Sequence, residues 1–395
     1  MNLKRLLLVF VIAILFASCI RLPETKFESA SPTTSAVQLP AIQELDYTQI
    51  SFDDIAPSGV NMLQCWNGMG MDDQGRIYIG FTSLRNDGRE DFPVFRYDPH
   101  TAESLFLGTF LEIVAVANNS YAGESIPKGH TRMIFAYGKM YMASQSFHDL
   151  KWEIDALPTY RGSHIFAYDT TAGTWEDLSA PMPEGVVTKH EGIVSLNILR
   201  SENLLVGLAH PSSDLVLYDY RTNELLEVVP GIPWRLGNPL SREIVVAPSG
   251  RIYTYRGTED PKQHNESNPV WVYNLHGGGM RNTGYTMTNG FWIGQTEKRD
   301  GSKIYVSTTN GELYEFDTAS ETFKGLGYML PKEQVNAGRH ILYTYAITLS
   351  PDEKKIYIIL SVLDKPAGSG ELYTFDLETK EYTFVQQLPK GIYQR

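Results

Sequence analysis

Two histidines frame one predicted β-hairpin in this chain. His130 stands just before, and His148 just after, a stretch rich in β-branched, aromatic and methionine residues that Gly138 interrupts. This composition predicts two strands, residues 131–137 and 139–146, joined by a tight turn at the glycine. In an antiparallel hairpin the start of the first strand lies beside the end of the second, so we expect both imidazoles at one edge of the protein. Because imidazole is suited to proton transfer near neutral pH, the pair predicts an acid–base site.

The hairpin is one copy of a repeat. A turn followed by a β-rich strand begins near residues 75, 138, 203, 250, 302 and 354, and each copy is followed by a second phrase that ends in an aromatic residue and Asp or Asn. Six units of four short strands, with no convincing helix between them, are typical of an all-β fold, the β-propeller. The expected blades cover residues 64–109, 130–179, 190–230, 240–287, 289–328 and 341–388.

Two parts of this architecture stay open in the sequence. Residues 42–55 either add an outer strand that closes the ring against the last blade or belong to a degenerate seventh blade. Insertions at residues 111–128 and 149–161 are expected to project from the same face as His148. The tyrosines at repeat positions are expected to pack between blades rather than to do chemistry.

The repeat also sorts the polar residues by face. In a four-stranded blade the inner strand begins, and the second strand ends, at one mouth of the central channel. Inner-strand starts carry His130, His190 and Arg242, with His340 less clearly placed, whereas second-strand ends carry His148, His210 and Arg256. Aromatic residues Trp66, Trp292 and Tyr343 stand near equivalent starts. Imidazoles at one repeated position predict a convergent pocket, although polar loops alone would also place histidines there. The remaining histidines, His100, His164, His264 and His276, are predicted to be surface or packing residues.

The amino terminus has the pattern of an export signal. Lys4 and Arg5 precede an apolar run at residues 6–16, and small residues lead to Cys19. This run is shorter than the ~20 residues that a spanning helix needs. The stretch resembles a bacterial lipoprotein signal, with residues 16–19 as the lipobox. The resemblance implies a signal peptide at residues 1–18, lipidation of Cys19, and an extracytoplasmic protein anchored at the outer membrane or cell surface. Residues 19–41 read as a flexible tether, and residues 42–395 as one propeller domain.

Charge and cysteine content narrow the classes of function. The 46 acidic and 34 basic residues give a net charge of −12. This balance argues against a nucleic-acid partner, because phosphate binding needs a basic face. It does not argue against an anionic ligand, since a few arginines at one mouth can hold a carboxylate. With Cys19 lipidated, Cys65 has no partner within the chain, so an intrachain disulfide is excluded.

The sequence contains few motifs that would indicate a metal-dependent enzyme or a serine hydrolase. Three imidazoles near one axis leave a divalent metal, Ca²⁺ or Zn²⁺, open, but the chain has no HExxH motif and no cysteine pair to hold one. No Gly-x-Ser-x-Gly nucleophile elbow is present either.

The predicted architecture, the export signal and the rim residues together resemble secreted propeller polysaccharide lyases of the ulvan-lyase and oligogalacturonate-lyase types. The resemblance implies β-elimination on uronate-containing polysaccharides or oligosaccharides. Arg242 and Arg256 would neutralise the uronate carboxylate. His130 and His148 would be the base and acid, with His190 or Tyr255 as alternatives. Sugar rings would contact Trp66, Trp234, Trp292, His210 and Tyr343.

Two other classes remain open in the sequence. A surface lipoprotein propeller can bind a glycan or a protein at the same mouth without chemistry. A structural or assembly lipoprotein would have no ligand at the mouth at all. The sequence favours the lyase only modestly over the binding protein.

Overall fold

A computed structural model of the chain describes residues 50–65, 67–145, 160–232, 241–255, 267–288, 290–362 and 370–388. Its internal contacts divide the chain into residues 1–41 and residues 42–395, and every described residue belongs to the second part. Among the described residues, no helix is both long enough and apolar enough to span a bilayer.

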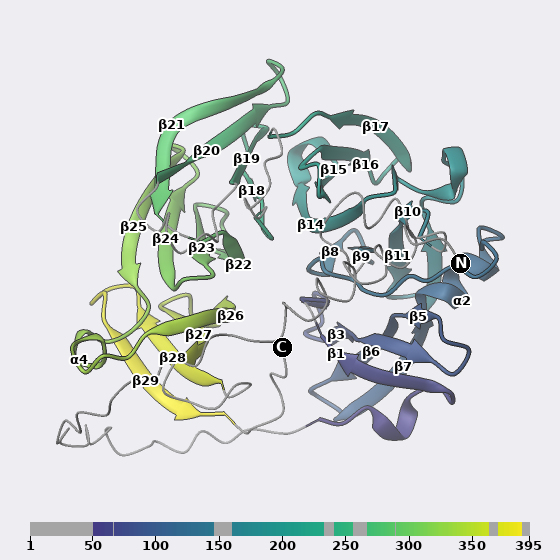
Figure 1. Cartoon of the computed structure of the whole chain (residues 1–395), viewed down its shortest axis with the longest axis horizontal. Helices are drawn as coiled ribbons and strands as arrows, with labels where there is room; N and C mark the ends of the chain where they lie inside the picture. The colour runs from purple at the N-terminus through teal and green to yellow at the C-terminus, as the bar shows by residue number, and fades with distance from the viewer. Residues whose placement is uncertain are drawn as a thin grey trace, which may run out of the picture. The chain divides into compact units, whose positions relative to one another are not determined.

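Six four-stranded antiparallel sheets dominate this part of the chain, and in each sheet the strand order follows the sequence. In Figure 1 their first strands face a common centre and their last strands lie outermost. The fold is therefore a β-propeller, as the repeat predicts. The blades consist of the following strands: blade 1, β2 (Met69–Met71), β3 (Ile77–Gly80), β6 (Pro93–Asp98) and β7 (Glu103–Thr109); blade 2, β8 (Ile134–Ala136), β9 (Lys139–Ala143), β11 (Ile165–Asp169) and β12 (Thr174–Asp177); blade 3, β14 (Gly192–Leu199), β15 (Leu204–His210), β16 (Leu215–Asp219) and β17 (Glu224–Val229); blade 4, β18 (Val245–Val246), β19 (Arg251–Tyr255), β20 (Ser267–Asn274) and β21 (Met280–Thr288); blade 5, β22 (Trp292–Glu297), β23 (Lys303–Thr308), β24 (Glu312–Asp317) and β25 (Thr322–Tyr328); blade 6, β26 (Ile341–Leu349), β27 (Lys355–Val362), β28 (Glu371–Asp376) and β29 (Tyr382–Gln387).

Turn chemistry explains why the repeat folds into blades. Between β8 and β9, Tyr137 and Gly138 both have positive φ, 48° and 74°, which is the backbone of a tight hairpin turn. Between the third and fourth strands of each blade, a side-chain oxygen accepts backbone N–H groups from the following turn. The acceptors are the repeated acidic or amide residues Asp98, Asp169, Asp219, Asn274, Asp317 and Asp376.

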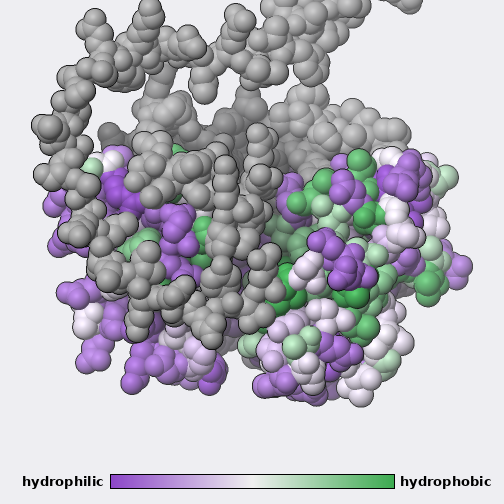
Figure 2. Space-filling model, turned by 90° about the horizontal axis from the view of Figure 1, so that it is seen from below, coloured by the Kyte–Doolittle hydropathy of each residue, from purple (hydrophilic) through white to green (hydrophobic). Residues whose placement is uncertain are grey.

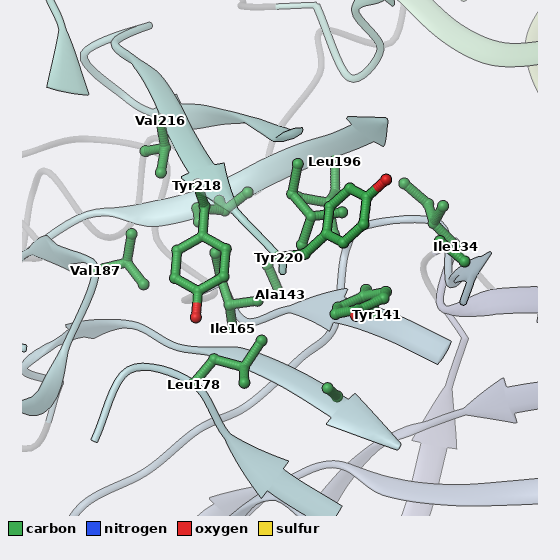
Figure 3. Close-up of a cluster of buried hydrophobic side chains, with 14 residues drawn as sticks. Ile134, Tyr141, Ala143, Ile165, Leu178, Val187, Leu196, Val216, Tyr218 and Tyr220 are labelled. Atoms are coloured by element: carbon green, nitrogen blue, oxygen red, sulfur yellow. The ribbon is translucent and has the colours of Figure 1, made fainter. Parts of the chain in front are cut away.

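The core lies between neighbouring blades. Figure 3 shows the cluster between blades 2 and 3, where Ile165, Leu196 and Val216 pack with buried tyrosines. Tyr141 of the repeat lies 5.7 Å from the ring of Tyr220 across this seam. The repeat tyrosines at positions 78, 253 and 305 are likewise buried. Their packing role, predicted from the repeat, is confirmed.

The inner strands of blades 1 and 2 approach very closely. A Cβ atom at Gly70 in β2 would lie 2.0 Å from the carbonyl oxygen of Met133, just before β8. Only glycine leaves room for the backbone at this point, so the sequence at Gly70 is set by the seam between the blades.

The structure adds elements that the repeat did not predict. Helix α2 (Phe110–Val116) lies in the insertion after blade 1, and α4 (Lys332–Asn336) precedes blade 6, so the expectation of no helix was wrong. Thr109 and Glu112 form a capping box at the start of α2, a pattern that is readable in the sequence. Further small elements are a three-stranded sheet of β1 (Val60–Gln64), β4 (Thr82–Arg85) and β5 (Glu90–Asp91), a two-stranded sheet of β10 (Gly162–Ser163) and β13 (Thr188–Lys189), and the 3-10 turns η1 (Asp53–Ile55), η2 (Pro183–Gly185) and η3 (Arg200–Glu202).

The predicted closing strand is not found in the described part of its segment. Residues 50–55 contain only the turn η1, and residues 42–49 lie outside the described residues. Figure 2 shows hydrophobic residues gathered on one side of the described surface. Among the described side chains, exposed apolar residues of blade 1 and its added sheet include Leu63, Met69, Met71, Leu84 and Leu105.

Candidate functional site

Polar side chains from four blades meet where the inner strands begin. We call this group the mouth cluster; it consists of Asn67, Lys128, His130, Arg132, His210, Arg242 and Glu243. Asn67, Arg132, Arg242 and Glu243 lie just before inner strands, Lys128 and His130 lie further ahead of β8, and His210 ends the second strand of blade 3. This placement follows the face rule from the sequence, because antiparallel strands bring these ends to one side of every blade.

His130 is the buried centre of the cationic part of the cluster. Only 5% of its surface is exposed. Burial, followed by the charges of Lys128, Arg242 and His210, holds the pKa of His130 well below its usual range. Its imidazole is therefore neutral near pH 7 and able to accept a proton. The structure thus brings three of the predicted site residues, His130, His210 and Arg242, into one electrostatic environment.

Blade 4 supplies the arginine of this environment through a fixed backbone. The N–H of Arg242 donates to the carbonyl oxygen of Trp292 at 2.7 Å, which ties the start of blade 4 to blade 5. The guanidinium carbon of Arg242 lies 5.7 Å from the ring centre of Phe291. An aromatic face at this distance attracts the cation and holds the side chain in place.

Glu243 is the acidic member of the cluster, and it was not among the predicted site residues. Its Oε2 lies 3.6 Å from Nε of Arg132, and its Oε1 accepts from Nδ2 of Asn67 at 3.4 Å. Burial raises the pKa of Glu243 to about 7, although Arg132 and Asn67 oppose the shift. The signal for it was present in the sequence, since Glu243 follows Arg242 at an inner-strand start.

Other predicted rim residues have different surroundings. His190 has a positive φ of 52°, and its N–H donates to the carbonyl oxygen of Arg161 beside the β10–β13 pair. His340 is exposed. Tyr343 is half-buried, with its ring 5.6 Å from that of Tyr345.

Tyr255 and Trp292 are core residues, which argues against their predicted roles. Both are fully buried between blades 4 and 5, and their rings are stacked at 5.7 Å. Nε1 of Trp292 donates to the sulfur of Met287 at 2.8 Å. Burial also raises the pKa of Tyr255 far above neutral, so its hydroxyl does not supply a tyrosinate base. The sequence pattern misled here because the start of an inner strand and the end of a second strand each have a channel side and a core side.

The remaining predicted site residues lie outside the described residues. These are Cys19, Trp66, His148, Trp234 and Arg256. His148 and Arg256 come after the described ends of β9 and β19. The predicted pairing of His148 with His130, and of Arg256 with Arg242, therefore stays a prediction.

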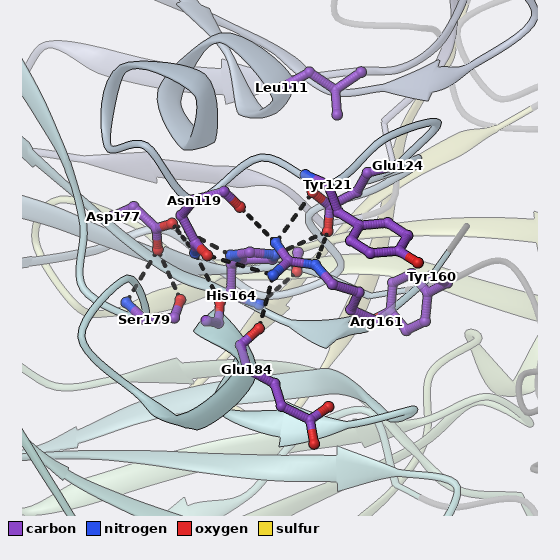
Figure 4. Close-up of polar contacts among 12 residues, drawn as sticks. Leu111, Asn119, Tyr121, Glu124, Tyr160, Arg161, His164, Asp177, Ser179 and Glu184 are labelled. Carbon is purple, nitrogen blue, oxygen red and sulfur yellow. Dashed lines mark hydrogen bonds and ion pairs between the residues drawn. The ribbon is translucent and has the colours of Figure 1, made fainter. Parts of the chain in front are cut away.

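A second polar network is buried beside blade 2 (Figure 4). The imidazole of His164 has no exposed surface; its Nδ1 lies 3.4 Å from Oδ2 of Asp177, and its Nε2 lies 3.6 Å from Oε1 of Glu124. The two carboxylates outweigh burial and raise the pKa of His164. Arg161 also donates to Glu124, at 2.8 and 3.1 Å, and Asn119 donates to Asp177 at 2.7 Å. The network ties the insertion after α2 to the end of β12, so His164 is a packing residue, as predicted.

A groove with a cavity volume of about 540 Å³ borders the His164 network, because Glu124 lines it. Arg85, Arg89, Tyr121 and residues of α2 also line the groove. Both arginines already pair with aspartates, at 2.8 and 2.7 Å. None of the mouth-cluster residues lines this groove, and we place the candidate site at the mouth cluster because the titratable groups with unusual surroundings converge there.

Metal binding finds no support in the described geometry. Within the described ranges, no group of three or more His, Cys, Asp or Glu side chains is arranged to hold an ion. The divalent metal left open by the sequence therefore has no candidate ligand set among these residues.

No protein-family model matches the chain, and no curated protein sequence matches it. Solved structures do resemble it. A chain of a mitotic checkpoint complex is 9% identical, with a TM-score of 0.50 over 94% of this chain and 89% of that chain. A candidate 6-phosphogluconolactonase from Bacteroides fragilis is 14% identical, with a TM-score of 0.49 over 77% and 79%. An oligogalacturonate lyase in complex with manganese is 12% identical, with a TM-score of 0.39 over 64% and 63%. At these identities the likeness concerns the propeller fold alone.

Proposed function

We propose that this propeller is a polysaccharide lyase that cleaves uronate-containing glycans by β-elimination at the mouth cluster. One observation carries the proposal: the neutral, buried imidazole of His130 lies in the field of three cationic or protonatable groups, Lys128, His210 and Arg242. A base and a carboxylate-binding cation are the two requirements for removing a proton next to a carboxylate.

Arg242, His130 and Lys128 each have a separate role in this reaction. Arg242 binds the uronate carboxylate and stabilises the negative charge that develops on it as the proton leaves. His130 accepts the C5 proton, and Lys128 adds positive charge beside the same carboxylate. The C5–H electron pair forms the C4–C5 double bond while the C4–O bond breaks, so the product carries an unsaturated uronate.

The test measures this product by its near-ultraviolet absorbance across uronate-rich polysaccharides, with and without chelator. We expect His130→Gln to lower the rate by about 10²- to 10⁴-fold, which is the usual contribution of a general base. His276→Gln is the matched control, because His276 is an exposed histidine of blade 4 outside the cluster. Undiminished product from His130→Gln would contradict the assignment.

The same cations also favour a second candidate, a non-catalytic propeller that binds an anionic glycan or protein. Retained binding of polygalacturonate, weakened by Arg242→Gln and accompanied by no unsaturated product, would favour this alternative over the lyase.

We further propose that the protein is extracytoplasmic and held at the outer membrane or cell surface by a lipid on Cys19. The charged, apolar and small-residue order of residues 4–19 supports this. Expression of Cys19→Ala in a bacterial host should move the protein from the membrane fraction to the soluble fraction and abolish incorporation of labelled fatty acid. Equal membrane association of the two forms would contradict the anchor.

A further inference from the structure

Three blades meet at one buried carboxyl group. Glu243 lies just before β18 of blade 4, and only 1% of its surface is exposed. Its two partners come from elsewhere in the ring: Asn67 lies just before β2 of blade 1, and Arg132 just before β8 of blade 2. The carboxyl group therefore lies where the inner ends of these blades converge, on the same side as His130.

The contacts of this carboxyl group are long for a structural ion pair. The Arg132 contact, at 3.6 Å, exceeds hydrogen-bond length, and the Asn67 contact, at 3.4 Å, is near its upper limit. A buried carboxylate with so little compensation is costly. Asn67 also has a φ of 116°, a conformation that L side chains rarely adopt. Unusual backbone and poor charge compensation at one place are typical of functional sites.

We propose, on the basis of the lyase function proposed above, that Glu243 donates the proton to the leaving oxygen of the cleaved glycosidic bond. Asn67 and Arg132 are positioning residues that hold the carboxyl group toward the mouth. As the C4–O bond breaks, its electron pair goes to the oxygen, and the oxygen takes the proton from Glu243. The resulting carboxylate is stabilised by Arg132, and proton exchange with water resets Glu243 and His130.

The surroundings of the two groups suit these opposite roles. Burial among cations lowers the pKa of His130, so it is neutral and can accept a proton. Burial raises the pKa of Glu243 to about 7, so it retains a proton into the neutral range. When their surroundings shift the pKa values of two titratable groups in opposite directions, one site can hold a base and an acid at the same pH. The pair also gives the site an acid within the described residues, whereas the sequence assigned that role to His148.

The test compares two substrates whose leaving groups differ in their need for a proton. The first is polygalacturonate, and the second is a uronate carrying a 4-nitrophenyl ether at C4, whose phenolate leaves unaided. We expect Glu243→Gln, which keeps the shape of the side chain, to lose about 10²- to 10⁴-fold on the polysaccharide. On the aryl ether it should lose less than tenfold. Its pH profile should also lack the fall in rate above about pH 7 that the wild type shows, because no acid remains to be deprotonated.

Two further variants separate chemistry from structure. Glu243→Asp keeps an acid and should keep the alkaline fall in rate with partial activity. Glu312→Gln is the matched control, because burial also raises the pKa of Glu312 but it lies in β24 of blade 5. Equal losses of Glu243→Gln on both substrates, or full activity on the polysaccharide, would overturn the inference while leaving the lyase intact. A wild-type protein that forms no unsaturated product from any uronate glycan would instead overturn the proposed function, and this inference with it.

Discussion

Oε2 of Glu243 lies 3.6 Å from Nε of Arg132, so a residue of blade 4 faces a residue of blade 2. Blade 3 separates these two blades in the sequence and in the ring. The contact therefore lies at the centre of the propeller, where the inner-strand ends converge, and not in a seam between two neighbouring blades. The strength of this ion pair depends on the charge of the Glu243 carboxyl group, because burial raises its pKa to about 7.

Removing the cation of this pair should destabilise the protein in a pH-dependent way. In Arg132→Met the buried Glu243 loses its cation and keeps its proton to higher pH, which costs about 1 to 2 kcal/mol near about pH 8, because each pH unit above its pKa costs about 1.4 kcal/mol. Glu243 has a raised pKa in the folded state, so its contribution to stability is full below its unfolded pKa and is lost as pH rises through about 7. The loss in Arg132→Met should therefore be small near about pH 5 and large near about pH 8, as measured by chemical denaturation. Arg299→Met, which removes an exposed ion pair, should change stability by less than about 1 kcal/mol at either pH.

The His164 network should limit stability from both sides of neutral pH. The raised pKa of His164 means that its contribution is lost as pH rises through the folded value, whereas the lowered pKa values of Glu124 and Asp177 mean that theirs are lost as pH falls. His164→Gln removes the charge between two buried carboxylates and should cost about 3 to 5 kcal/mol near neutral pH. Thermal melting across pH checks this, with exposed His276→Gln as the comparison. A variant as stable as the wild type would show that the imidazole is not charged in the folded protein.

The seam between blades 1 and 2 should not tolerate a side chain at Gly70. A Cβ there would lie 2.0 Å from the Met133 carbonyl oxygen, and a backbone oxygen has little freedom to move. We expect Gly70→Ala to lower the free energy of unfolding by about 2 kcal/mol or more, within the 1 to 3 kcal/mol usual for overpacking. Gly325→Ala is the control, because a Cβ at Gly325 would have its nearest neighbour at 3.8 Å. Equal stability of the two variants would mean that the inner strands separate more easily than the contact implies.

Trp292 should behave as a core residue. Trp292→Leu leaves a cavity beside Tyr255 and should cost about 3 kcal/mol, toward the lower end of the range for large-to-small core changes. Affinity for polygalacturonate, measured on the folded fraction by calorimetry, should be unchanged. If affinity fell while stability held, the aromatic ring would be a sugar contact after all.

Much of the architecture was readable in the sequence. The recurring Ile-Tyr strand and the Tyr-Asp turn predict the blades, because strand composition and Asx turns act locally. Tyr141 and Asp169 illustrate this: one packs in the seam and the other caps a turn, as the repeat requires. The sheet formed by β1, β4 and β5 was missed because β4 and β5 lie between two strands of blade 1, in a segment that the repeat does not include.

The sequence by itself determined the propeller, the order of its blades and the side on which His130, His210 and Arg242 gather. Only the tertiary structure decided which residues meet. It placed Trp292 and Tyr255 in the core, and it set Glu243 beside Asn67 and Arg132 from other blades. The reason is physical: strand periodicity is a property of neighbouring residues, whereas contact across the centre depends on how all the blades close together, and burial at that centre then sets the pKa of each group.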